Sequence, residues 1–138
     1  MDKISNAIKI SIEHDMRTFA SLTPKRKYSL IVKNISDYHR ANRITAYAKT
    51  VEDRDLNMVH ASRIFALVSR EIFSLDEEQT AQFINYALDR FDVSKIQSGK
   101  HFNYINMLST ISVILSGNGA DISAIESLIN QLQDDLCK

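Results

Sequence analysis

Apolar residues recur along this chain at spacings of three and four positions, which is typical of helices that each bury one face. We interpret the pattern as six helices joined by short connections. Their expected ranges are about 2–22, 24–47, 52–73, 74–91, 100–116 and 122–136. The fifth segment is apolar around most of its circumference, so we expect it to be central and buried.

Local signals mark where several helices begin and end. Pro24 suits a first helical turn, where its missing N–H costs nothing, and Thr23 suits the N-cap before it. The runs 74–77 (SLDE) and 123–126 (SAIE) each place a glutamate three positions after a serine, which predicts two capping boxes. The run 117–119 (GNG) predicts the end of the fifth helix.

Composition supports an all-α fold. The 138 residues include three glycines and one proline, whereas sheets and loop-rich folds need many turn residues. We therefore predict a single helical domain, 1–138, folded as a compact bundle of about six helices. The one cysteine, Cys137, has no internal disulfide partner, which favours a cytoplasmic location. The longest apolar run is Ile64–Val68, so we expect no membrane-spanning segment.

Charge is distributed unevenly, although the formal net charge is zero. The first 49 residues carry ten Lys and Arg against four Asp and Glu, and the remaining 89 carry seven against thirteen. Asymmetry of this kind bears on partners rather than on fold, because it steers an encounter and fixes its orientation.

The basic residues gather in the expected second helix. Arg26, Lys33 and Arg40 are seven positions apart, so they share one helix face, opposite the apolar stripe. We expect this face to meet an acidic protein surface, which would make the chain a non-enzymatic regulator or adaptor that acts through protein–protein contacts. The candidate binding residues are Lys25, Arg26, Lys33, Arg40, Arg43 and Tyr47.

The first alternative assigns nucleic acid to the same face. A stripe of one sign neutralises phosphates, which would suit a transcriptional, plasmid or phage regulator. The chain as a whole is not basic and shows no helix-turn-helix pattern, so protein contact remains the leading interpretation.

The second alternative comes from residues 54–60 (RDLNMVH). An arginine, polar residues and a histidine in an all-α chain of this size resemble the motif of HEPN-type helical ribonucleases. The resemblance covers seven residues and implies that Arg54 and His60 would lie across a helix dimer and cleave RNA without metal. An imidazole that titrates near neutral pH suits that acid–base role.

The usual signals of other enzymes are absent from the sequence. The four histidines have no metal-ligand spacing, and three glycines cannot build a phosphate-binding loop. We therefore expect no catalytic residue, no metal and no cofactor.

The last apolar stripe leaves the oligomeric state open. Its residues, 122, 125, 129, 132 and 136, are spaced three and four apart over about two heptads. The stripe either closes the core, which is slightly favoured, or pairs with its twin in a homodimer. In the dimeric alternative the interface residues are Ile122, Ile125, Ile129 and Leu132.

Overall fold

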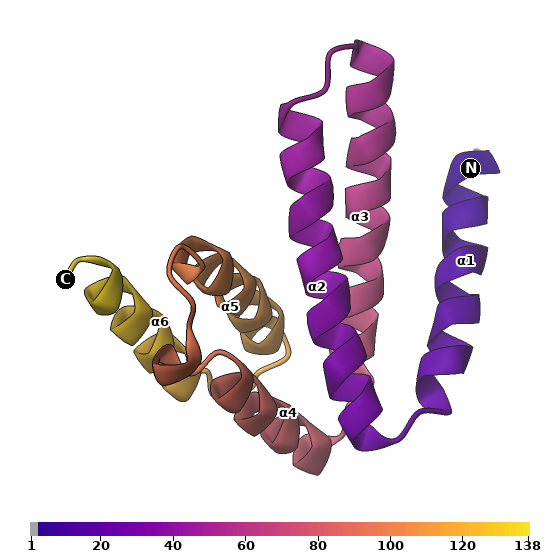
Figure 1. Ribbon diagram of the computed structural model, residues 1–138. Coiled ribbons are helices and arrows are strands. Elements are labelled where there is room, and N and C mark those ends of the chain that lie inside the picture. The colour runs from indigo at the N-terminus through magenta and orange to yellow at the C-terminus, as the bar shows by residue number, and fades with distance from the viewer. Residues whose placement is uncertain (1–2) are drawn as a thin grey trace. The chain divides into compact units, whose positions relative to one another are not determined.

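The computed structural model describes residues 3–138, apart from the side chain of Ile4, and all regular structure in that range is helical (Figure 1). The elements are α1 (Lys3–Ala20), α2 (Pro24–Ala46), α3 (Val51–Phe73), α4 (Glu77–Arg90), the 3₁₀ turn η1 (Val93–Lys95), α5 (His101–Gly117) and α6 (Ser123–Leu136). The prediction of an all-α fold with about six helices is confirmed.

The contacts within the chain divide it into two compact units, residues 1–74 and residues 75–138. We refer to them as unit 1 and unit 2 and describe each by itself. Whether they form the single domain expected from the sequence stays a prediction.

Unit 1 is built on the antiparallel hairpin of α2 and α3, and α1 packs along α3 (Figure 1). Pro24 begins α2 as expected, although the Thr23 side chain forms no capping hydrogen bond. Tyr38 of α2 contacts the ring of Phe65 on α3, with centroids 5.4 Å apart. The largest fully buried apolar side chains of this unit are Phe19, Ile31, Ile35 and Ile72.

Unit 2 contains α4, α5 and α6, with α6 packed against both other helices and against η1. The rings of Phe91 and Tyr104 meet edge to face at 4.9 Å between centroids, which joins the end of α4 to α5. The His101 ring nitrogen Nε2 lies 2.7 Å from an Asp135 carboxylate oxygen and connects α5 to the end of α6. The largest fully buried apolar side chains here are Phe83, Phe91, Leu108, Ile111, Leu115, Ile125 and Leu132.

Helix α5 was expected to be central and buried, but only one of its sides is buried. Leu108, Ile111 and Leu115 are 0% exposed, whereas Phe102 and Val113 are 68% and 66% exposed. The two exposed residues are eleven positions apart, which is three helical turns, and so they share the outer face. High apolar content therefore does not place a helix at the centre.

The cap of α4 differs from the predicted one. Asp76, not Ser74, is the N-cap: its carboxylate accepts a hydrogen bond from the Gln79 backbone N–H, and the Gln79 side chain accepts one from the Asp76 N–H. Ser74 instead ends α3, and its hydroxyl donates to the backbone oxygen of Glu71 at 2.7 Å.

The predicted capping box of α6 is also wrong. Ile122 precedes the helix and makes no side-chain cap. The Asp121 carboxylate accepts hydrogen bonds from both the backbone N–H and the hydroxyl of Ser123, and these bonds lower the pKa of Asp121. An aspartate two positions earlier thus takes the role that the spacing had assigned to Ser123.

Candidate functional site

The three basic residues singled out by their spacing lie on the outer face of α2. Arg26, Lys33 and Arg40 are exposed, while Ile31 and Ile35 on the opposite face are 0% exposed. The heptad spacing places one basic side chain about every two turns along this face. We call these three residues the basic stripe.

An acidic side chain lies within the basic stripe. One oxygen of Asp37 is 3.0 Å from Lys33 Nζ, and the other is 3.6 Å from Arg40 Nη1. Exposed pairs of this kind add little stability, about 0.3–0.5 kcal/mol each, but they hold long side chains along the helix surface. Asp37 also cancels one of the three positive charges, so the stripe is weaker as a phosphate-binding surface than its sequence indicates.

The other predicted binding residues are divided between the two ends of α2. Lys25 is exposed in the first turn. Arg43 and Tyr47 lie at the opposite end, where they line a shallow open hollow together with Lys49 and Asp53. The structure therefore does not gather all six candidates in one place.

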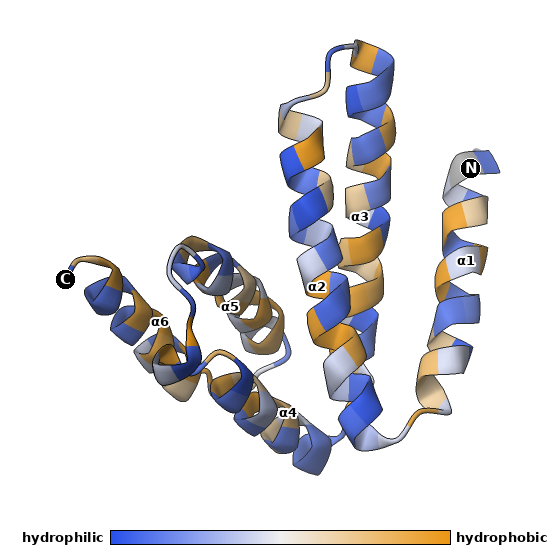
Figure 2. Ribbon diagram, in the orientation of Figure 1, coloured by the Kyte–Doolittle hydropathy of each residue, from blue (hydrophilic) through white to orange (hydrophobic). Residues whose placement is uncertain are grey.

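Sequence reasoning missed the exposed apolar residues where α2 turns into α3. Among the described residues eleven large apolar side chains are exposed, and six of them fall between positions 44 and 59, which makes this a concentration rather than scatter. They are Ile44, Tyr47, Val51, Leu56, Met58 and Val59. Figure 2 shows apolar and hydrophilic stretches alternating around this end of the hairpin. The apolar spacing could not predict this exposure. It shows which residues share a helix face, but not whether another element covers that face.

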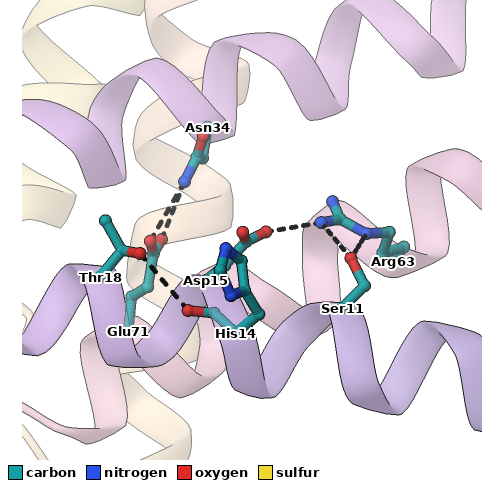
Figure 3. A network of polar contacts seen from close by, with 7 residues as sticks. All are labelled: Ser11, His14, Asp15, Thr18, Asn34, Arg63 and Glu71. Atoms are coloured by element: carbon teal, nitrogen blue, oxygen red, sulfur yellow. Dashed lines mark hydrogen bonds and ion pairs between the residues drawn. The ribbon is translucent and has the colours of Figure 1, made fainter.

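A polar cluster, of which Glu71 alone is fully buried, joins the three helices of unit 1 (Figure 3). Glu71 on α3 is 1% exposed, and the Asn34 side-chain amide on α2 donates to its two carboxylate oxygens at 3.1 and 3.2 Å. On the α1 side, the Arg63 guanidinium donates to the Ser11 hydroxyl and pairs with the Asp15 carboxylate.

The environment of Glu71 disfavours its ionised form. Burial raises its pKa from the ordinary value of 4.5 to about 7. The Asn34 hydrogen bonds oppose this change, and the nearby Asp15 carboxylate adds to it. The arrangement is a hydrogen-bonded core acid.

The residues of the ribonuclease alternative lie apart within one chain. Arg54 and His60 are both exposed on α3, and Arg54 Nε is 3.8 Å from an oxygen of Asp55. Six helical positions correspond to a rotation of about 240°, so the two side chains leave different sides of the helix.

The apolar stripe of α6 is largely taken up within the fold. Ile125 and Leu132 are 0% exposed, and Ile122 and Ile129 are half-buried. Because α6 packs on α5 and α4, the stripe faces other helices of unit 2. Whether the stripe also takes part in a homodimer stays a prediction.

Charge asymmetry follows the division into units. Residues 1–74 carry thirteen Lys and Arg against eight Asp and Glu, and residues 75–138 carry four against nine. Unit 1 is therefore net positive and also carries the basic stripe.

Between residues 3 and 138, no helix has both the length and the apolar content needed to cross a bilayer. Over the same span, no three metal-ligating side chains of His, Cys, Asp or Glu come together as a metal site.

Comparison with other proteins assigns neither a family nor a function to this chain. A scan against protein-family models and searches of curated proteins and of solved structures all give no match. The functional argument therefore rests on the surface of this chain alone.

Proposed function

We propose that this protein is a non-enzymatic regulator or adaptor that acts by protein–protein contact, with the outer face of α2 docking on an acidic protein surface. The observation that carries the proposal is the exposed basic stripe of Arg26, Lys33 and Arg40 on a net-positive unit. Complementary charge on a partner would raise the association rate and fix the orientation of the complex.

The position of Asp37 favours protein over nucleic acid as the ligand. A phosphate backbone presents negative charge at every nucleotide, so an acid in the middle of the stripe would oppose it. A folded protein can place a donor opposite Asp37 and acids opposite Lys33 and Arg40. The alternation of positive and negative charges along α2 therefore matches a protein surface of mixed charge better than a uniformly negative phosphate backbone.

The test is recovery of partners from the native host at low salt, with and without nuclease treatment. We expect a stoichiometric polypeptide that survives nuclease and is lost in the Arg26→Glu/Arg40→Glu variant. The matched control is Lys9→Glu/Arg17→Glu, which makes the same charge change at exposed positions of α1 and should retain the partner.

Two results would contradict the proposal. One is a partner that binds both double variants equally, because the basic stripe would then not be its site. The other is recovery of nucleic acid alone, with an affinity that falls steeply as salt rises, as expected when phosphate contacts release counterions.

A further inference from the structure

The hollow at the end of α2 combines an apolar lining with two positive charges. Its volume is about 530 Å³, and its walls come from the end of α2, the connection that follows and the first two turns of α3. Apolar groups are supplied by Ile44, Tyr47 and Ala48, and the charges by Arg43 and Lys49. We call this the α2-end hollow. Ile44 and Tyr47 are 51% and 83% exposed, so the fold leaves much of their apolar surface uncovered.

Hydrogen bonds hold both walls of the α2-end hollow in place. On the α2 side, the backbone N–H of Tyr47 donates to the Ile44 carbonyl at 3.1 Å and closes the last turn of the helix. On the α3 side, the Thr50 hydroxyl accepts a hydrogen bond from the Asp53 backbone N–H at 3.1 Å and caps the helix. The walls are therefore formed before a ligand binds, as is usual for binding sites.

The α2-end hollow lies on the same face of α2 as the basic stripe. Its residues Arg43, Ile44 and Tyr47 follow Arg40 at three, four and seven positions. At about 100° per residue, all three side chains lie within about 60° of Arg40 around the helix axis. A partner that docks on the basic stripe therefore reaches the hollow without leaving this face.

We propose that the α2-end hollow binds a large apolar side chain of the partner, carried within the acidic segment that docks on the basic stripe. Ile44 and Tyr47 cover this side chain, and Arg43 and Lys49 pair with the acids next to it. The proposal rests on the proposed function, because it describes how the partner of the basic stripe is anchored.

The charge of the lining favours an acidic segment over a basic one. Arg43 and Lys49 stand against one acid of the lining, Asp53, and the neighbouring basic stripe adds further positive charge. Charge on the stripe steers an encounter, whereas a few anchors in formed pockets carry most of the energy of an interface. An acidic segment with an apolar anchor uses both features of this face.

The shape of the α2-end hollow favours a protein side chain over a free small molecule. Pockets for small molecules bury most of their ligand, whereas this hollow is shallow and open. A side chain on a docked segment needs less enclosure, because the contacts of that segment with the basic stripe also hold it. The exposed Tyr47 suits the role, since tyrosine is favoured where anchors bind.

The test measures the binding of synthetic thirteen-residue peptides to the full chain by isothermal titration calorimetry at low salt. The probe has one central Phe with six Glu or Asp residues on each side. Six extended residues span about 20 Å, which is the distance along α2 from Tyr47 to Lys33. One control peptide has Ala in place of Phe, and another keeps Phe but has Lys in place of the acids.

We expect the acidic Phe peptide to bind about tenfold more tightly than the acidic Ala peptide, because it buries an aromatic side chain. The basic Phe peptide should show no measurable binding. Ile44→Ser/Tyr47→Ser removes the apolar lining without changing charge, so it should abolish the tenfold difference and leave the affinity for the Ala peptide unchanged. The matched control Phe102→Ser/Val113→Ser removes two exposed apolar side chains of α5 and should keep the difference. Circular dichroism should show unchanged helicity in both variants.

Four results would overturn the proposal. Equal affinities for the acidic Phe and Ala peptides would do so and leave the proposed function standing, since the basic stripe alone would then explain binding. Failure of both acidic peptides to bind would overturn the proposed function as well. A tenfold difference that survives Ile44→Ser/Tyr47→Ser would place the anchor elsewhere. Tighter binding of a thirteen-nucleotide single-stranded DNA, lost in the same variant, would assign the hollow to base stacking instead.

Discussion

Replacing Glu71 by glutamine should make unit 1 more stable at alkaline pH while changing it little in acid. Glutamine keeps the size of the side chain and an oxygen that can accept the Asn34 hydrogen bond, but it carries no charge at any pH. The native carboxyl, by contrast, is neutral only while it holds its proton. At higher pH it carries a negative charge in the interior of unit 1.

The magnitude follows from the difference between the folded and unfolded pKa values. A carboxyl with a pKa of about 7 when folded and 4.5 when unfolded binds more protons in the native state between these values. Its contribution is therefore most favourable below pH 4.5, is lost as the pH rises toward 7, and is constant above that. At about 1.4 kcal/mol per pKa unit, the full loss is about 3 kcal/mol, of which about 2–3 kcal/mol falls between pH 5 and 8.

The assay is urea denaturation of the wild type and Glu71→Gln at pH 5 and pH 8. Taking the difference between the two proteins cancels the titration of the histidines, which is common to both. We expect the advantage of the variant to grow by about 2–3 kcal/mol from pH 5 to pH 8. The control is Glu52→Gln on the exposed start of the same helix, whose effect should not vary with pH. Parallel pH profiles for the wild type and Glu71→Gln would refute the reasoning, because they would mean that Glu71 is solvated or ionised throughout.

Three further predictions concern caps, core and helix attachment. Asp76→Ala should lower the free energy of unfolding by about 1 kcal/mol in denaturant titrations, and Asp76→Asn by much less, because asparagine still caps α4. Phe83→Ala should cost about 3–5 kcal/mol at a position that is 0% exposed, whereas Phe102→Ala should cost less than about 0.5 kcal/mol by the same measurement. Arg63→Ala should cost about 1 kcal/mol by removing the polar contacts to α1. Hydrogen exchange should then become faster in α1 but not at the centre of α2.

The helices were predictable from the sequence because their apolar spacing is regular, but the start of α4 was not. Two overlapping pairs, Ser74 with Glu77 and Asp76 with Gln79, have capping-box spacing. The choice between them depends on where α3 ends, since Ser74 closes that helix by donating to the Glu71 carbonyl. Local spacing holds no information about that choice.

The basic stripe was predictable for the same reason, because a spacing of seven fixes a helix face. The buried acid was not. In the sequence Glu71 is one charged residue among many, and its hydrogen-bond partner Asn34 is 37 positions away on another helix. Its burial is decided by how α1, α2 and α3 pack, so no pattern within α3 alone could reveal it.

Unit 1 departs twice from the rule that apolar groups lie inside and charges outside, and the two departures differ in kind. Glu71 is inside, but Asn34 satisfies it, so its position has an explanation within the fold. Ile44, Tyr47 and Val51 are outside and more than half exposed, so folding of this unit gains little from their apolar surface. Surface apolar residues scattered singly need no explanation, whereas a concentration of them at one end of a hairpin does. The first departure therefore bears on stability, whereas the second has no explanation within the fold of unit 1.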